Sequence, residues 1–181
     1  MDKNLIPAQQ EALLQLARKA ISLYLETGET LKKDTSDESF LEHRGTFVTL
    51  KIQGKLRGCI GYPIPFKSLY ATIIDAAISA ASSDYRFSPL TKEELQETNI
   101  EISVLTPPRP IEDIHEIKVG VHGIIISKGP NKGLLLPQVP VEWKWDLETY
   151  LEHGCQKAGL NKNEWRKGVK IEIFSAQVFS E

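Results

Sequence analysis

The sequence predicts an α+β fold in which mainly antiparallel sheets are flanked by helices. Segments with helical and with strand periodicity mix along the chain without a regular βαβ repeat. Two pairs of strand-like segments are separated by short glycine-containing turns, a pattern typical of antiparallel hairpins. The 181 residues, 41% of them hydrophobic, suffice for one sizeable core or for two small lobes that share one.

The first half of the chain is predicted to form two long helices and a hairpin. Apolar residues recur at helical spacing over 7–25, and Gly28 suits the end of this helix. Residues 29–44 are polar and charged, so they are expected to run over the surface. The expected hairpin strands are 47–52 and 56–61, and the expected second helix, rich in alanine, is 68–83.

The second half begins with a short helix, because Thr91 and Glu94 fit a capping box. Prolines cluster at 107–110, which makes the region near 106–112 the best candidate for a linker between lobes. Residues 137–145 are expected to be irregular, and Asp146 is expected to cap a helix. The remaining expected elements are strands 99–105, 120–127, 133–136 and 169–179, and a helix from 146 to 158.

Composition and charge exclude several classes of protein. A formal charge of −2 and a pI near 6.1 argue against a protein that binds duplex nucleic acid through phosphate contacts. No apolar run approaches the roughly 20 residues needed to span a bilayer, and no secretory leader precedes the first helix. Cys59 and Cys155 are far apart and lack CxxC spacing, which favours free thiols. We therefore expect a cytoplasmic protein with no membrane association.

The stretch Leu56–Gly61 is the strongest candidate for a functional site. It places the guanidinium of Arg57 two residues from the thiol of Cys59, and side chains two apart on a strand share a face. Arg57 could then bind an anion or favour the thiolate. Gly58 and Gly61 lack the Cβ atoms that would block a ligand or a neighbouring strand. The alternative is that Cys59 is a small buried hydrophobic residue and that the glycines serve sheet packing.

Three further groups of residues are weaker candidates. Glu142 and Asp146 are four apart and would share a face of a helical turn as paired acids, although Asp146 is better explained as a helix cap. His122 lies between glycines and could act as a base or a ligand. The loop 84–87 combines an acid, Arg86 and two aromatic residues, and could line a ligand pocket or anchor the core. Motifs for zinc, dinucleotides or P-loop nucleotides are missing, so no metal or cofactor of these kinds is predicted.

Several ordered blocks together resemble the AMMECR-type domain family, whose prokaryotic members are called protein A of the AmmeMemoRadiSam system. The chain departs from the family pattern at Tyr62, where a small polar residue is expected, and at Pro140, where alanine is usual. The matching blocks are 56–61, 86–90 with 94–95, 102–105, 120–124, 135–139, 145–146, 155–160 and 178–179.

The resemblance implies one AMMECR-type domain over residues 1–181, with two lobes and a cleft between them that the Arg57–Cys59 strand faces. It also implies association with two proteins, a Memo-type protein similar to non-haem iron dioxygenases and a radical SAM protein. No biochemical activity is established through the resemblance.

Two classes of function remain open. A binding or accessory module would take a small anionic ligand or a protein tail in the cleft. An enzyme would use Cys59 as nucleophile or thiol ligand, Arg57 as anion clamp, and His122 or Glu142 as acid or base. The binding module ranks first because no base stands at a fixed spacing from Cys59, and nucleic-acid binding ranks a distant third. The residues expected to bind the ligand are Arg57, Gly58, Gly61, Arg86 and Gln138.

Overall fold

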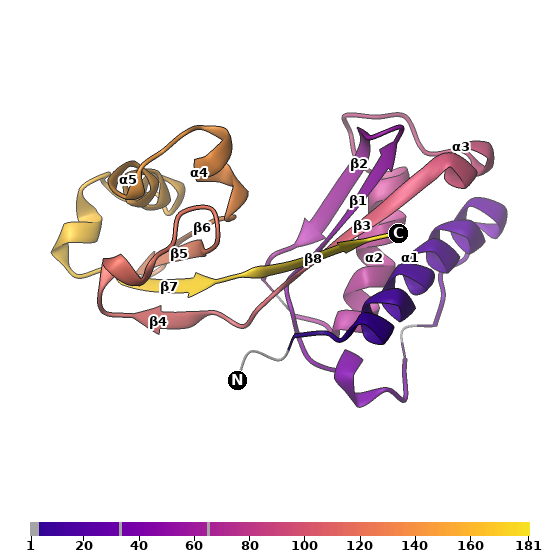
Figure 1. Ribbon diagram of the computed structural model, residues 1–181, viewed down its shortest axis with the longest axis horizontal. Coiled ribbons are helices and arrows are strands. Elements are labelled where there is room, and N and C mark those ends of the chain that lie inside the picture. Colours follow the sequence, from indigo (N-terminus) through magenta and orange to yellow (C-terminus); the bar gives the residue numbers. More distant parts are fainter. Residues whose placement is uncertain (1–3, 33, 65) are drawn as a thin grey trace. The chain divides into compact units, whose positions relative to one another are not determined.

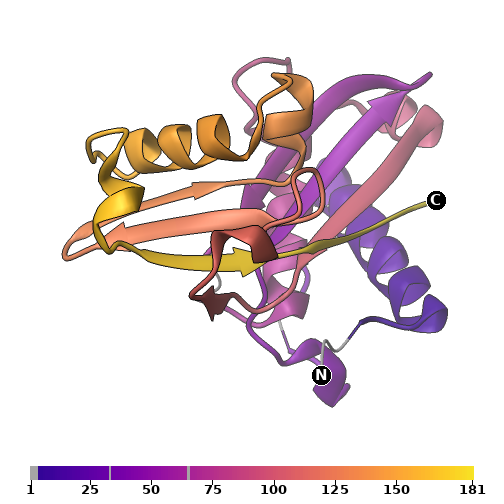
Figure 2. The same cartoon turned by 60° about the vertical axis from the view of Figure 1, so that its left-hand side comes forward.

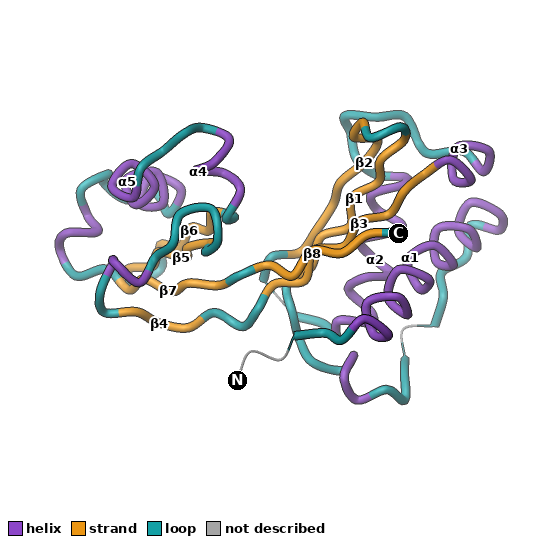
Figure 3. Tube along the Cα trace, in the orientation of Figure 1, coloured by secondary structure: helices purple, strands orange, loops and turns teal. Residues whose placement is uncertain are grey.

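The computed structural model describes residues 4–32, 34–64 and 66–181. The chain divides into two compact units. Unit 1 comprises the chain up to Leu105 together with Gln177–Glu181, and unit 2 comprises Thr106–Ala176. The chain thus leaves unit 1 once and returns to it once, which can be followed in Figures 1 and 3.

Unit 1 contains a four-stranded sheet, sheet A, with the strand order β2-β1-β3-β8. Strand β1 is central and pairs antiparallel with both β2 and β3. Helices α1 and α2 pack against each other and against one face of this sheet (Figure 1). The elements are α1 (Pro7–Thr27), β1 (Thr46–Ile52), β2 (Lys55–Tyr62), α2 (Leu69–Ser82), α3 (Lys92–Glu97), β3 (Thr98–Leu105) and β8 (Ala176–Ser180), with a short 3-10 helix at Glu38–Phe40.

The alternation of side chains along the strands builds the core of unit 1. Val48 and Leu50 of β1 are fully buried, as are Ile100 and Ile102 of β3 opposite them. Small alanines on α2 let the helix backbone approach the sheet, and Gly58 of β2 extends this close packing. Because the core residues alternate, the residues between them, such as Thr49, lie on the other face of sheet A.

Unit 2 contains a second four-stranded sheet, sheet B, with the order β4-β7-β5-β6, and helix α5 packs on it (Figure 2). Tyr150, Leu151 and Cys155 of α5 are fully buried in one cluster with Ile124 and Ile126 of β5. The elements are β4 (Arg109–Ile111), β5 (Gly123–Lys128), β6 (Asn131–Leu135), α4 (Gln138–Glu142), α5 (Leu147–Lys157) and β7 (Lys170–Phe174), with 3-10 helices at Ile114–Glu116 and Glu164–Lys167.

The α+β prediction is confirmed, and most predicted elements lie where the sequence placed them. Gly28 ends α1 in the left-handed conformation, and Thr91 and Glu94 form the predicted capping box of α3. Two predictions are wrong. The segment 137–145 contains the short helix α4. The closing strand expected over 169–179 is two strands, β7 and β8, which belong to different sheets. In the described part of the chain, no helix is long and apolar enough to cross a membrane.

Candidate functional site

Strand β2 has a β-bulge at Arg57, two residues before Cys59. Leu50 of β1 opposes Gly58, whereas the next residue, Lys51, opposes Leu56. Arg57 is therefore an extra residue on β2, and the simple two-residue alternation does not hold there. The regular alternation on which the shared face of Arg57 and Cys59 was predicted is therefore interrupted at Arg57, and the two residues have different hydrogen-bond partners.

Four of the five N–H groups of the Arg57 guanidinium have partners within unit 1. Its Nε and Nη2 donate to the two carboxylate oxygens of Glu94 at 2.9 and 2.8 Å. Its Nη1 donates to the carbonyl of Ser88 at 2.9 Å, and Nη2 also lies 3.4 Å from the carbonyl of Pro89. This arginine holds the pKa of Glu94 below its ordinary value, with help from the Thr91 backbone N–H. Arg57 thus fastens α3 and the loop before it to β2.

The arginine that bonds to Cys59 is Arg86. Strand β2 is an edge of sheet A, and the N–H and carbonyl of Cys59 have partners outside the sheet. The Cys59 N–H donates to Asp84 Oδ2 at 2.9 Å, and Arg86 Nη2 donates to the Cys59 carbonyl at 3.3 Å. Side chains of the 84–87 loop therefore take the place of a neighbouring strand at this position.

Asp84 and Arg86 form a bidentate ion pair. Arg86 Nε and Nη2 donate to Oδ1 and Oδ2 of Asp84 at 2.9 and 2.7 Å. The Asp84 side chain is 2% exposed, whereas that of Arg86 is 44% exposed. The hydrogen bonds from Arg86 hold the pKa of Asp84 well below its usual range, against the opposing effect of burial. The pair anchors the loop with a buried charge and leaves the guanidinium accessible.

The thiol of Cys59 lies on the face of sheet A opposite the helices. It is half-buried, and the hydroxyl of Thr49, its cross-strand neighbour, donates to Sγ at 3.2 Å. The two glycines beside it accommodate protein atoms. A Cβ on Gly58 would lie 2.2 Å from the Ala80 carbonyl oxygen, and one on Gly61 would lie 2.2 Å from Cδ1 of Phe47. The packing explanation for both glycines therefore has direct support.

The other predicted residues belong to unit 2. His122 accepts a hydrogen bond at Nδ1 from the Lys118 N–H at 3.2 Å, which leaves Nε2 for another partner. The turn that carries it lies against α4, because a Cβ on Gly120 would come within 2.9 Å of Val141 Cγ2. The hydroxyl of Tyr150 lies 3.2 Å from the His122 carbonyl and 3.3 Å from that of Leu136, so it ties this turn to the start of α4.

Gln138 and Glu142 are the first and last residues of α4, and both are exposed. The expectation that Glu142 pairs with Asp146 on one helical turn is wrong. Lys144 has a left-handed backbone (φ 56°) and separates α4 from α5. Asp146 is the N-cap of α5 and accepts from the Thr149 N–H at 2.8 Å, as the alternative explanation had it.

Sequence reasoning named the 84–87 loop but did not single out Asp84, and it missed Thr49 and Tyr150. An aspartate two residues before an arginine is a local signal that could have suggested the ion pair. Thr49 and Tyr150 carry no such signal, since their roles depend on contacts between distant segments. Among the described residues, no three His, Cys, Asp or Glu side chains gather closely enough to hold a metal ion.

Comparison with known proteins places this geometry in a family. The family model described as AMMECR1 matches residues 14–179. Protein MK0488 of Methanopyrus kandleri is 46% identical over 191 residues, covering 100% of this chain and 92% of the relative. A Thermococcus gammatolerans protein is 48% identical, covering 94% of this chain and 89% of its own. The crystal structure of the uncharacterized protein PH0010 from Pyrococcus horikoshii superimposes with a TM-score of 0.76 at 44% identity, covering 95% of this chain and 91% of that one. The chain belongs to the AMMECR1 family.

Proposed function

We propose that the chain is a cytosolic binding module that recognises an acidic protein tail at the edge of sheet A around Cys59, and that it acts with Memo-type and radical SAM partners. The observation that carries the proposal is the state of Arg86. Its Nε and Nη2 are fixed by Asp84 and the Cys59 carbonyl, and in the described part of the chain its Nη1 has no hydrogen-bond partner. Arg86 is also more exposed than Arg57, 44% against 15%, and is therefore the better placed of the two guanidinium groups to receive a carboxylate.

Tyr85 supports the same surface as a contact site. Its side chain is 95% exposed, yet its two neighbours, Asp84 and Arg86, are held rigidly against β2. A tyrosine presented in this way loses little conformational entropy on binding, and tyrosine and arginine are enriched among the residues that dominate interfaces. The backbone of Cys59 bonds to both Asp84 and Arg86, so a tail bound at this loop would lie close to the thiol.

The test is calorimetric titration of the chain with a purified Memo-type protein and with a purified radical SAM partner. Tyr85→Ala should weaken binding about tenfold, since truncation of a dominant interface residue costs more than 1 kcal/mol. Phe66→Ala is the matched control, because Phe66 is also an exposed aromatic residue of unit 1 (61%). Binding that Tyr85→Ala leaves unchanged, or no binding to either partner, would contradict the proposal.

The alternative function is an enzyme that uses Cys59 as nucleophile. The thiol is half-buried and has a hydroxyl neighbour, Thr49, but in the described part of unit 1 no side-chain base is hydrogen-bonded to it. His122 and Glu142, the proposed acid or base groups, lie in unit 2. Alkylation followed by mass spectrometry separates the two functions. Rapid modification of Cys59 at pH 6, where an ordinary thiol is protonated, would favour the enzyme.

A further inference from the structure

Helices α1 and α3 of unit 1 line an open pocket of about 310 Å³, on the helix-covered side of sheet A and apart from Cys59. A volume of this size is at the lower end of the range of small-molecule sites. Residues of α1 that are one and two turns apart form one wall, and residues on one face of α3 form the other. The residues that the argument uses are Arg18, Leu25 and Glu26 from α1 and Lys92, Leu95 and Gln96 from α3.

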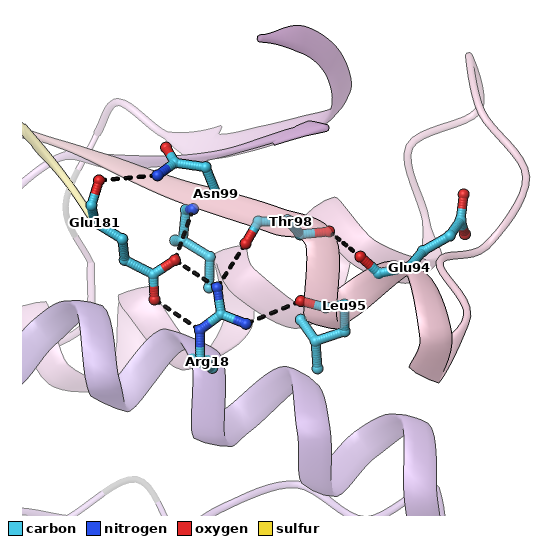
Figure 4. A network of polar contacts seen from close by, with 7 residues as sticks. Arg18, Glu94, Leu95, Thr98, Asn99 and Glu181 are labelled. Atoms are coloured by element: carbon cyan, nitrogen blue, oxygen red, sulfur yellow. Dashed lines mark hydrogen bonds and ion pairs between the residues drawn. The ribbon is translucent and has the colours of Figure 1, made fainter. Parts of the chain in front are cut away.

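Arg18 is a preorganised donor at this pocket. It bonds to both carboxylate oxygens of Glu181, to the Leu95 carbonyl at 2.9 Å and to the Thr98 carbonyl at 2.6 Å (Figure 4). These bonds use Nε, both hydrogens of Nη2 and one hydrogen of Nη1. A guanidinium has five N–H groups, so in the described part of the chain one Nη1 hydrogen remains without a partner. Its side chain is 35% exposed.

The other lining groups complement one another. Lys92 is exposed and makes no ion pair among the described residues, and Gln96 adds a side-chain amide. Glu26 contributes a carboxylate that accepts a hydrogen bond from the Ser22 hydroxyl at 3.1 Å and retains further acceptor capacity. Leu25 and Leu95 supply apolar surface between these polar groups.

We propose that this pocket binds a free α-amino acid with a branched apolar side chain. Its carboxylate is received by Lys92 and Gln96 with the remaining Nη1 hydrogen of Arg18, whose charge Glu181 already balances. Its ammonium group is received by Glu26 and its side chain by the two leucines. This class of ligand uses every kind of group that the pocket offers, whereas a simple anion would leave Glu26 as a repulsive neighbour. The proposal is independent of the surface around Cys59.

The test is a methyl NMR titration of the full chain with L-leucine, which follows the methyl signals of Leu25 and Leu95. We expect saturable shifts of both. Three analogues each lack one feature: 4-methylpentanoate lacks the ammonium group, 3-methylbutylamine lacks the carboxylate, and glycine lacks the side chain. Each should bind at least about tenfold more weakly, as expected for the loss of a charge-assisted hydrogen bond or of a buried leucine side chain.

Variants at exposed positions complete the test. Glu26→Gln should remove the preference for leucine over 4-methylpentanoate, and Gln96→Trp should fill the pocket and abolish the shifts. Glu29→Gln is the control, because Glu29 is exposed just beyond α1 and does not line the pocket. The proposal is overturned if no saturable shift occurs up to the solubility limit of leucine, or if 4-methylpentanoate binds as tightly as leucine.

Discussion

Both cysteines of this chain directly follow a glycine, but the two dipeptides have different surroundings. Gly58-Cys59 lies on an edge strand. The missing side chain of Gly58 lets the backbone of α2 approach, and the Cys59 N–H donates to the buried carboxylate of Asp84. Gly154-Cys155 lies within α5, where the glycine admits isoleucine side chains and the thiol is fully buried. Burial raises the pKa of the Cys155 thiol. Neighbouring residues in the sequence therefore do not decide whether such a thiol is accessible. The supporting contacts do.

Alanine substitutions of Gly58 and Gly154 should show the largest difference in the free energy of unfolding. Gly58→Ala should lower the free energy of unfolding by about 3 kcal/mol, because its Cβ would lie 2.2 Å from a backbone oxygen of α2 and the helix would have to move. Gly154→Ala should cost less than about 1 kcal/mol. The atoms nearest to its Cβ would be the Cδ1 atoms of Ile126 and Ile124, which are the ends of flexible side chains, and alanine favours the helix. Urea unfolding of both variants measures this, and equal losses would contradict the comparison.

The ion pair of Asp84 and Arg86, which bonds to the backbone of Cys59, should show the next largest effect. Asp84→Asn should destabilise the protein by about 2 kcal/mol, because it weakens charge-assisted hydrogen bonds to Arg86 and to the Cys59 N–H. Asp146→Asn is the control, since asparagine caps a helix as well as aspartate does.

The sign of the pH dependence follows from the lowered pKa of Asp84. A carboxyl group with a lower pKa in the folded than in the unfolded state contributes stability above the unfolded value of about 3.9, and this contribution is lost as the pH falls below it. The difference between wild type and Asp84→Asn should therefore shrink in acid. A difference that stays constant from neutral pH down to pH 2 would show that the charge of Asp84 is not the cause.

Thiol accessibility should distinguish the two sites by a smaller margin. In the folded protein, iodoacetamide should modify Cys59 at least about tenfold faster than Cys155, because Cys59 is half-buried and Cys155 is fully buried. Mass spectrometry of peptides after timed quenching measures both rates in one sample. In urea the two rates should converge, and a persistent difference there would point to local sequence as the cause.

The smallest effect is expected at alkaline pH. The pKa of Cys155 is raised in the folded state, so its neutral form contributes stability that is present below the unfolded value of about 8.5 and is lost as the pH rises through the folded value. The wild type should therefore lose stability relative to Cys155→Ala above about pH 8.5, by less than about 1 kcal/mol. Cys59→Ala serves as the control. If the free energy of unfolding falls with pH equally in wild type and in Cys155→Ala, Cys155 is not the source of the alkaline loss of stability.

Local signals predicted most of the fold. The sequence predicted four local features, because each depends on residues a few positions apart. They are the helix caps at Thr91 and Asp146, the end of α1 at Gly28 and the hairpin turn before β2. The break between β7 and β8 was not readable, since Ser175 interrupts an otherwise strand-like run and the change of sheet depends on partners elsewhere in the chain.

The candidate site was predicted less well, for a specific reason. The sequence identified the strand with Cys59 and the loop with Arg86, but it indicated neither the bulge at Arg57 nor the bond from Arg86 to the Cys59 carbonyl. A register shift between paired strands leaves no mark in the residues of one strand alone. Arg57 was therefore predicted to bind an anionic ligand, whereas in the structure it is paired with the carboxylate of Glu94.

The insertion of unit 2 between β3 and β8 has a consequence for how the chain folds. Strand β8 can join sheet A only after the ends of residues 106–176 come together, and closing a loop of this length carries an entropic cost. The two ends are joined where the Thr106 N–H donates to the Ser175 carbonyl and the Ser175 N–H to Thr106 Oγ1, each at 2.8 Å. With these bonds formed, the start of β8 is held close to the end of β3. The completion of sheet A therefore depends on closing unit 2, although unit 2 itself adds only one residue, Ala176, to that sheet.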